Sequence, residues 1–316
     1  MKDLKERIDI HGHYFPPAYV RLMNRHGLTV LDGVKAPAWD IERQWEYMDR
    51  LNITYTTLSL SSPHLHMGDK AEAAETAREC NEYGAQLRRQ YPEQFLPLAS
   101  LPLPEVDDSI LEIRYCREHL GIHGFAFLTN FRGIYLGDPA LDPVMEELNK
   151  EKTLLTIHPT TPAAVCTGGA DQLPAPVMEY FFETTRAVTN MLLKRVVRRY
   201  PNLRFVVPHG GAFLTILSDR LIPLAGVLLQ DQDLDIGGDL AKLYYDLAGF
   251  SMPKQYGLLT KITDETHLLY GSDSPFTFLP ICIKQAEAMD QVLSDRMAEK
   301  IYHSNPRKLF NDLDNR

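Results

Sequence analysis

Two histidines separated by one glycine end the first strand-like segment of the chain, Arg7-Ile8-Asp9-Ile10-His11-Gly12-His13. Alternate residues of a strand point to the same face, so both imidazoles can reach one point. The glycine between them lets the backbone pack closely against a neighbour. Two nitrogen ligands that converge at a strand end are a common beginning of a mononuclear metal site. Such pairs also occur as hydrogen-bonded surface residues, so a metal site needs support from the rest of the chain.

Three further polar residues follow apolar, strand-like segments in the same way. His158 ends Leu155-Thr156-Ile157-His158, His209 follows Val206-Val207-Pro208, and Asp273 follows Tyr270-Gly271-Ser272. Any one of them could cap a helix or hydrogen-bond a loop. Five such residues at matching strand ends instead favour a metal site built from histidines and a carboxylate.

Eight expected strands, each followed by an expected helix, position these residues. We expect the strands at residues 8–11, 53–59, 95–100, 122–128, 153–158, 203–209, 243–247 and 267–271. This alternation predicts a (β/α)8 TIM barrel, an α/β fold whose active site lies at the C-terminal ends of the strands. No linker divides the chain, so we expect one domain over residues 1–316. An irregular inserted loop at 14–38 precedes a helix capped by Asp40, and extra helices end the chain.

Composition excludes several classes of function. The chain has 316 residues and a net charge of -9, which disfavours nucleic acid as a partner. It contains no apolar stretch near the roughly 20 residues that cross a bilayer, and its first residues do not resemble a signal peptide. Four scattered cysteines, at positions 80, 116, 166 and 282, are typical of a reducing compartment. We therefore expect a cytoplasmic protein with no nucleic-acid or membrane partner.

The order of these motifs resembles the amidohydrolase superfamily. Within it, the chain is similar to the branch that contains aminocarboxymuconate-semialdehyde, γ-resorcylate and 6-methylsalicylate decarboxylases. The resemblance runs from Ile8 to about Phe310. Further matching segments are Trp39-Asp40, Leu101-Pro102-Leu103, Glu183-Thr184-Thr185 and Asn305-Pro306-Arg307-Lys308-Leu309-Phe310.

The resemblance implies a role for each strand-end residue. His11, His13, His158 and Asp273 would be the metal ligands, and Asp273 would also take part in catalysis. His209 would be an unligated histidine that serves as acid and base. The segment 122–128 contains no lysine that could bridge two metals, so we expect one divalent ion. Three imidazoles and a carboxylate suit Zn²⁺, and Mn²⁺ remains possible.

Substrate residues are also implied. In the relatives, an arginine at the spacing of Arg220 binds the substrate carboxylate from the neighbouring subunit, which predicts a homodimer. The alternative is an ordinary surface arginine of a helix. A second substrate arginine of the relatives falls on Gln44, next to Arg43, which favours a smaller acid with one carboxylate. We expect an aromatic pocket lined by Tyr14, Phe15, Phe127, Asn130 and Phe276, although core or lid packing is an equal alternative for each.

These observations predict a metal-dependent, nonoxidative decarboxylase of a small hydroxylated aromatic or conjugated carboxylic acid. A metal-dependent hydrolase of a lactone or amide would use the same barrel and ligands. A hydratase is a third possibility, because a relative of that activity also begins with a His-Gly-His-Tyr segment. A metal-binding protein without activity is disfavoured, since all ligands and the proton-transfer histidine are present.

Overall fold

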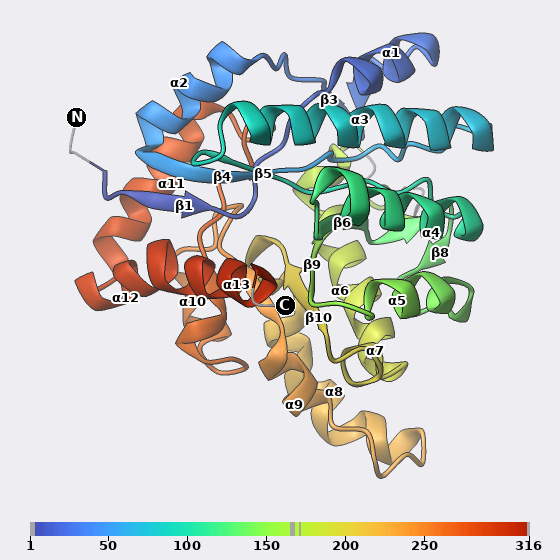
Figure 1. Ribbon diagram of the computed structural model, residues 1–316. Coiled ribbons are helices and arrows are strands. Elements are labelled where there is room, and N and C mark those ends of the chain that lie inside the picture. Colours follow the sequence, from blue (N-terminus) through green and yellow to red (C-terminus); the bar gives the residue numbers. More distant parts are fainter. Residues whose placement is uncertain (1–3, 165–167, 171, 315–316) are drawn as a thin grey trace.

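The computed structural model describes residues 4–164, 168–170 and 172–314; Cys166 lies outside them. Within these residues eight parallel strands pair in chain order around a ring (Figure 1). The strands are β1 (Arg7–Asp9), β4 (Ile53–Leu58), β5 (Phe95–Pro97), β6 (Gly124–Leu128), β9 (Thr153–His158), β10 (Leu203–Val207), β11 (Tyr244–Asp246) and β12 (Leu268–Leu269).

Two contacts close the ring. The strands form a sheet of order β1-β4-β5 and a sheet of order β12-β11-β10-β9-β6. Ala99 pairs with Phe125 at one junction, and Gly12 pairs with Ser274 at the other. The Ile10 amide also donates to the Tyr270 carbonyl at 2.9 Å. The predicted (β/α)8 barrel is therefore confirmed.

A helix follows each strand and covers the outside of the barrel. These helices are α2 (Ile41–Leu51), α3 (Lys70–Gln90), α4 (Val106–Tyr115), α5 (Asp142–Leu148), α6 (Glu179–Leu193), α8 (Leu214–Leu228), α10 (Lys254–Leu259) and α11 (Leu279–Val292). Side-chain caps fix where some of them begin. The Asp40 carboxylate accepts from the Arg43 amide at 2.8 Å, as expected for an N-cap, and Asp69 does the same for α3.

The remaining helices are short connections or close the barrel. They include α7 (Val196–Arg199), α9 (Ile236–Lys242), α12 (Asp295–Glu299) and α13 (Asn305–Asp314). Leu309 and Leu313 of α13 join an apolar cluster with Ile10, Leu98, Leu154, Val206 and Leu269. This cluster connects strands from several sides of the barrel, and Figure 1 shows α13 lying across them. The extra C-terminal helices therefore pack against the barrel interior.

Residues 14–38 differ from the prediction of an irregular loop. They contain helix α1 (Pro17–Arg25) and a hairpin of β2 (Val30–Leu31) and β3 (Val34–Lys35). Pro17 occupies the first turn of α1, where a missing N–H costs nothing. The insertion after the first strand therefore has structure of its own.

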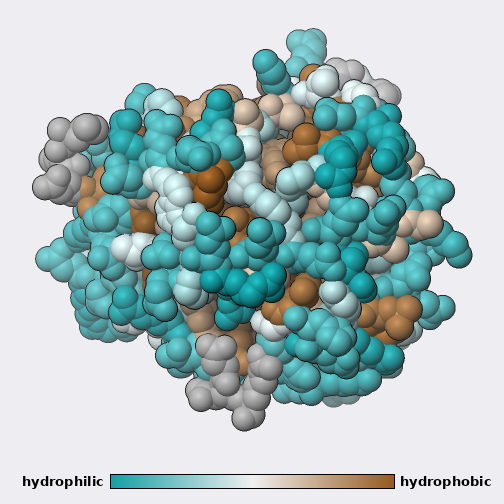
Figure 2. Space-filling view, turned by 45° about the horizontal axis from the view of Figure 1, so that its top comes forward, coloured by the Kyte–Doolittle hydropathy of each residue, from teal (hydrophilic) through white to brown (hydrophobic). Residues whose placement is uncertain are grey.

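No described helix combines the length and apolarity that crossing a membrane requires. The face of the molecule in Figure 2 is largely hydrophilic, with hydrophobic residues in small separate patches.

Candidate active site

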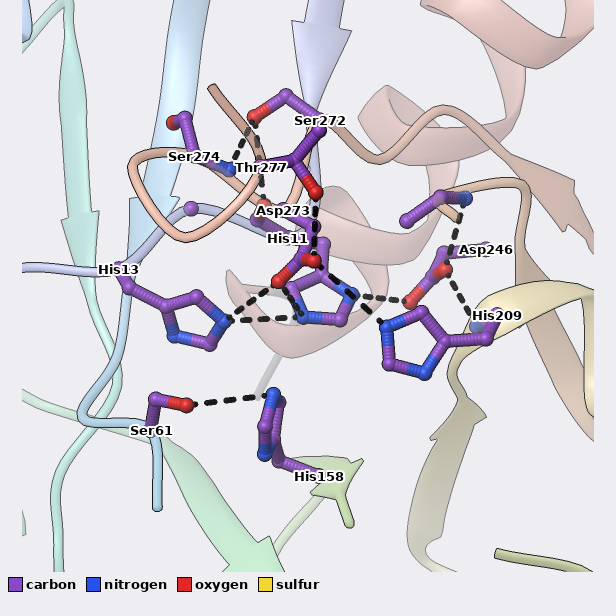
Figure 3. A network of polar contacts seen from close by, with 12 residues as sticks. His11, His13, Ser61, His158, His209, Asp246, Ser272, Asp273, Ser274 and Thr277 are labelled. Atoms are coloured by element: carbon purple, nitrogen blue, oxygen red, sulfur yellow. Dashed lines mark hydrogen bonds and ion pairs between the residues drawn. The ribbon is translucent and has the colours of Figure 1, made fainter. Parts of the chain in front are cut away.

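Four side chains converge at the C-terminal ends of three strands. His11 and His13 follow β1, His158 ends β9, and Asp273 follows β12. One ligand atom from each lies within 4.8 Å of the others, and the three histidines are buried (Figure 3). The close packing expected at Gly12 is confirmed, because a Cβ there would lie 2.7 Å from the Thr57 carbonyl oxygen. The structure thus brings together the four residues predicted as ligands.

Hydrogen bonds orient all three imidazoles in the same way. The Nδ1 atom of His11 lies 2.9 Å from Asp246 Oδ2, that of His13 lies 3.3 Å from the Ser59 carbonyl, and that of His158 lies 2.7 Å from the Pro159 carbonyl. Carboxylate and carbonyl oxygens only accept, and the Ser59 hydroxyl, which also lies 3.2 Å from His13 Nδ1, donates to the Gly12 carbonyl. Each Nδ1 therefore carries the proton in the neutral ring. Each Nε2 is then left as an acceptor, which is the arrangement that metal-ligating histidines require.

The acceptor atoms of His11, His13 and Asp273 face one another. His11 Nε2 lies 3.1 Å from His13 Nε2, and Asp273 Oδ1 lies 3.5 Å and 3.3 Å from these two atoms. Lone pairs in such an arrangement repel unless a cation or proton lies between them. Three imidazole nitrogens and one carboxylate oxygen are a donor set that fits a single divalent metal ion.

The pKa values of these groups follow from burial and from their mutual contacts. Burial raises the pKa of Asp273, but the imidazoles of His13, His11 and His209 outweigh it and lower that pKa strongly. Burial lowers the pKa of His13 and His158, which favours the neutral form that binds metals. Burial also lowers the pKa of His11, but Asp246 and Asp273 raise it to about 9. Metal binding at His11 therefore has to displace a proton.

His209 lies beside this cluster without joining it. Its Nε2 atom is 4.0 Å from Asp273 Oδ2, and its ring stacks on Phe181 with centroids 6.0 Å apart. The backbone is in the left-handed region at φ 54°, and a Cβ on Gly249 would lie 2.9 Å from His209 Cδ2. Burial lowers the pKa of His209, although Asp273 opposes this effect. Such a position suits proton transfer better than ligation.

Asp246 is a further residue of the candidate site, and the sequence pattern did not indicate it. Its Oδ2 atom accepts from His11, while Oδ1 accepts from the backbone amides of His209 at 3.0 Å and Ala248 at 3.1 Å. One buried carboxylate therefore orients both a metal-ligand candidate and the proton-transfer candidate (Figure 3). Asp246 ends β11, so the strand-end rule could have found it. The predicted strand at 243–247 runs one residue too far, so Asp246 lies inside it rather than at its end.

Two hydroxyl groups also support the cluster. Thr277 Oγ1 donates to Asp273 Oδ2 at 2.8 Å, and Ser61 Oγ lies 3.3 Å from His158 Nε2. Neither residue type carries a recognisable signal in the sequence, because serine and threonine are common in loops.

A cavity of about 390 Å³ opens above these groups. Its polar lining comes from the cluster and its surroundings, and the rest is apolar and aromatic. The lining residues are Leu31, Val34, Ser61, His158, Pro176, Val177, Tyr180, Phe181, His209, Gly249, Phe250, Asp273, Phe276 and Thr277. A cavity of this size holds a small aromatic molecule.

Comparison with known proteins identifies the family. The family model described as amidohydrolase matches residues 8–311. The chain belongs to the amidohydrolase family. It is 31% identical to a decarboxylase of Aspergillus niger, over 96% of this chain and 87% of the relative. It is 30% identical to a 6-methylsalicylic acid decarboxylase of Aspergillus aculeatus, over 85% of this chain and 84% of the relative. The resemblance inferred from the motifs is confirmed.

Solved structures agree on the fold of this amidohydrolase. A crystal structure of an amidohydrolase II superposes with a TM-score of 0.93 at 34% identity, covering 97% of this chain and all of that chain. A 5-carboxyvanillate decarboxylase from Novosphingobium aromaticivorans, solved with bound manganese, superposes with a TM-score of 0.86 at 22% identity. That match covers 98% of this chain and all of the other.

Of the residues expected to line the pocket of the amidohydrolase, only Phe276 does so among those described. Tyr14 is 1% exposed, donates to the Cys80 carbonyl at 3.3 Å and packs against Trp39 and Tyr83. It directly follows His13, and adjacent residues of an extended chain point to opposite faces. Tyr14 therefore packs within the fold and is not among the residues that line this cavity.

Asn130 is also placed outside the cavity lining. Its amide donates to the Thr161 carbonyl at 3.2 Å and to Glu183 Oε2 at 3.1 Å, which gives it a structural role. Arg220 lies exposed on α8, outside the cavity lining of its own chain. Gln44 is buried and accepts from the Trp39 indole at 3.1 Å, so its position also serves the fold.

Proposed function

We propose that this amidohydrolase is a metal-dependent, nonoxidative decarboxylase of a small hydroxylated aromatic acid with a single carboxylate. The observation that carries the proposal is the buried cluster of His11, His13, His158 and Asp273, with His209 beside it and an aromatic-lined cavity above. Decarboxylases among the relatives support it over other activities of the family.

The four-residue cluster would hold one divalent ion. Such an ion would supply a positive charge that offsets the negative charge developing on the substrate. Three imidazole ligands favour Zn²⁺, whereas the manganese of the 5-carboxyvanillate decarboxylase favours Mn²⁺. Zinc and a cytoplasmic location remain predictions.

His209 would deliver the proton. Its lowered pKa makes the protonated ring a stronger acid than free imidazole. Protonation of the ring carbon that bears the carboxylate leaves that carbon with both a hydrogen and the carboxylate. The bond between the ring carbon and the carboxylate carbon then breaks and carbon dioxide leaves. The electron pair of that bond returns to the ring, which restores aromaticity. Asp273, 4.0 Å from His209 Nε2, supports the charged form of the imidazole during this transfer.

The cavity favours a substrate with one carboxylate. Among the described residues that line it, none is a lysine or an arginine. A second carboxylate would lose its hydration without a compensating positive charge, which is costly in a largely apolar site. The dicarboxylic substrate of the aminocarboxymuconate-semialdehyde enzymes therefore fits this cavity poorly.

A homodimer is the assembly that we propose. Helix α8 carries Arg220 together with several exposed apolar side chains, including Ile216, Val227 and Leu228, which are 63%, 74% and 74% exposed. Apolar residues this exposed often mark a protein–protein contact. A second copy packed on α8 would bury them and would place Arg220 near the partner's cavity, where it could bind the substrate carboxylate.

A substrate panel tests the function. Metal-loaded protein is assayed for carbon dioxide release from hydroxybenzoates and for ring opening of lactones. We expect release from at least one hydroxybenzoate and no lactone opening. Turnover of a lactone or amide alone would support the hydrolase, and addition of water to a conjugated acid would support the hydratase. No turnover by fully metallated protein would contradict an enzymatic role.

A further inference from the structure

The cavity lining divides into a polar and an apolar part. Its polar side chains belong to the candidate metal cluster and its neighbours, apart from Tyr180. Aromatic rings contact the histidines directly: Phe276 lies 5.5 Å from His13, and Tyr180 lies 5.8 Å from His158, between ring centroids. The remaining lining side chains are apolar: Leu31, Val34, Pro176, Val177, Phe181 and Phe250. This part of the lining has nothing to offer a charged or hydrogen-bonding group.

Two of these apolar residues come from the β2–β3 hairpin rather than from the barrel. Leu31 and Val34 face each other in the hairpin register, and Leu31 is 4% exposed. The hairpin forms a separate two-stranded sheet that shares no strand pairing with the barrel strands among the described residues. Its position over the cavity therefore depends on side-chain and loop contacts.

Asp32, at the turn of the hairpin, supplies several of these contacts. Its carboxylate accepts hydrogen bonds from Thr161 Oγ1 and from the Tyr180 hydroxyl. Its backbone carbonyl accepts from the Ala175 amide at 3.0 Å. The loop after β9 and helix α6 are thus tied to the hairpin through one residue, and Tyr180 itself lines the cavity.

The tight turn brings the backbone of this segment close to the loop after β9. Asp32 has φ 50°, in the left-handed region, and a Cβ on Gly33 would lie 3.0 Å from Pro174 Cα. The hairpin therefore rests directly on the loop, and Asp32 sits where its carboxylate reaches both hydroxyl donors.

We propose that Asp32 is a positioning residue that holds the hairpin over the cavity, so that Leu31 and Val34 select an acid with an apolar ring substituent. The identity of the ligand as an aromatic acid rests on the proposed function. A methyl group buried against these side chains would strengthen binding about fourfold. Without the contacts of the Asp32 carboxylate, Leu31 and Val34 are no longer held in place, and the gain in affinity from the substituent is lost.

Binding of ligands that cannot decarboxylate tests this proposal. The probes are 2-nitrophenol, in which a nitro group replaces the carboxylate, and the isomers of its ring-methylated derivative. Calorimetry with zinc-loaded protein measures the ratio of affinities for methylated and unmethylated ligand. We expect at least one isomer to bind wild-type protein about fourfold more tightly than 2-nitrophenol. Asp32→Ala should bring this ratio close to one while metal content and the affinity for 2-nitrophenol stay unchanged.

Two further variants separate positioning from a general structural effect. Leu31→Ala should lower the same affinity ratio although Asp32 is intact, because it removes an apolar side chain that would contact the substituent. Lys35→Ala, an exposed change in the same hairpin, should leave the ratio as in wild type. A purely structural role of Asp32 would alter the affinity for both ligands alike and leave their ratio unchanged.

The outcomes distinguish this proposal from the proposed function. An unchanged ratio in Asp32→Ala, no preference for any methylated isomer in wild type, or no binding of nitrophenols at all would overturn the positioning role. A preference that depends on Asp32, in a protein that releases no carbon dioxide from any hydroxybenzoate, would support the positioning role and contradict the decarboxylase.

Discussion

Replacing Asp246 by asparagine should weaken metal binding although no ligand is removed. The Asp246 carboxylate accepts from three donors: His11 Nδ1 at 2.9 Å and the amides of His209 and Ala248. Asparagine has one oxygen for these donors, and its NH₂ group would face either the imidazole or the two amides. If it faces His11, the ring must accept at Nδ1 and protonate Nε2, which is the atom needed for the metal.

The size of the effect follows from the bond that is lost. A hydrogen bond to a charged group contributes about 1.5–3 kcal/mol, which corresponds to about 10- to 100-fold in affinity. We expect a loss of this size when metal-stripped protein is titrated with Zn²⁺ in competition with a chromophoric chelator. Activity at saturating metal should fall as well, because Asp246 also holds the backbone of His209.

Asp9→Asn is a matched control for Asp246→Asn. Asp9 is equally buried, and its carboxylate accepts from the backbone amides of His11 and Ser272 rather than from an imidazole. Burial raises the pKa of Asp9, so an amide resembles its protonated form. Asp9→Asn should lower the melting temperature, but it should reduce metal affinity less than Asp246→Asn does. Wild-type metal affinity in a folded Asp246→Asn protein would refute the reasoning.

Four other substitutions test separate parts of the site and the fold. His209→Ala should retain one equivalent of metal and lose at least about 10²–10⁴-fold in kcat. His13→Ala should instead lose both the metal and the activity. A His209→Ala protein that is folded but metal-free would show that His209 is a ligand. Arg220→Ala should raise KM more than it lowers kcat. If wild-type protein is a monomer by ultracentrifugation and is fully active, Arg220 does not bind substrate in a neighbouring subunit. Arg114 and Lys150, which donate to Glu147 at 2.8 Å and 2.7 Å, together lower the pKa of Glu147 to about 2. The Glu147→Gln variant should therefore have a lower melting temperature than wild type at pH 7. This difference in melting temperature should disappear as the pH falls from about 4.5 towards 2. A difference that does not change with pH would exclude the ion pair as its cause.

The positions of the candidate ligands could be predicted because topology alone determines them. Parallel strands of a closed barrel end at one rim, so residues at strand ends meet whatever the loops do. The rule failed at Asp246 because it depends on knowing where a strand ends, and Tyr244–Asp246 is only three residues long. A boundary error of one residue was enough to hide the group that orients both His11 and His209.

The substrate-facing residues could not be predicted in the same way. Tyr14 directly follows a ligand, but its side chain points to the opposite face and packs against Trp39 and Tyr83. Leu31 and Val34 reach the cavity through a hairpin that is held by side-chain bonds of Asp32, and such bonds leave no periodic pattern in a sequence. Loop conformation, rather than strand order, decides which side chains line the cavity.

The most direct test of the central claim is decarboxylation in deuterated water. Metal-loaded protein is incubated with hydroxybenzoates such as 6-methylsalicylate, and both products are analysed by mass spectrometry and NMR. The account predicts one carbon dioxide for each phenol formed, with one deuterium on the carbon that carried the carboxylate. Chelator-stripped protein should form neither product. A phenol without deuterium at that carbon, or full activity in the metal-stripped protein, would contradict it.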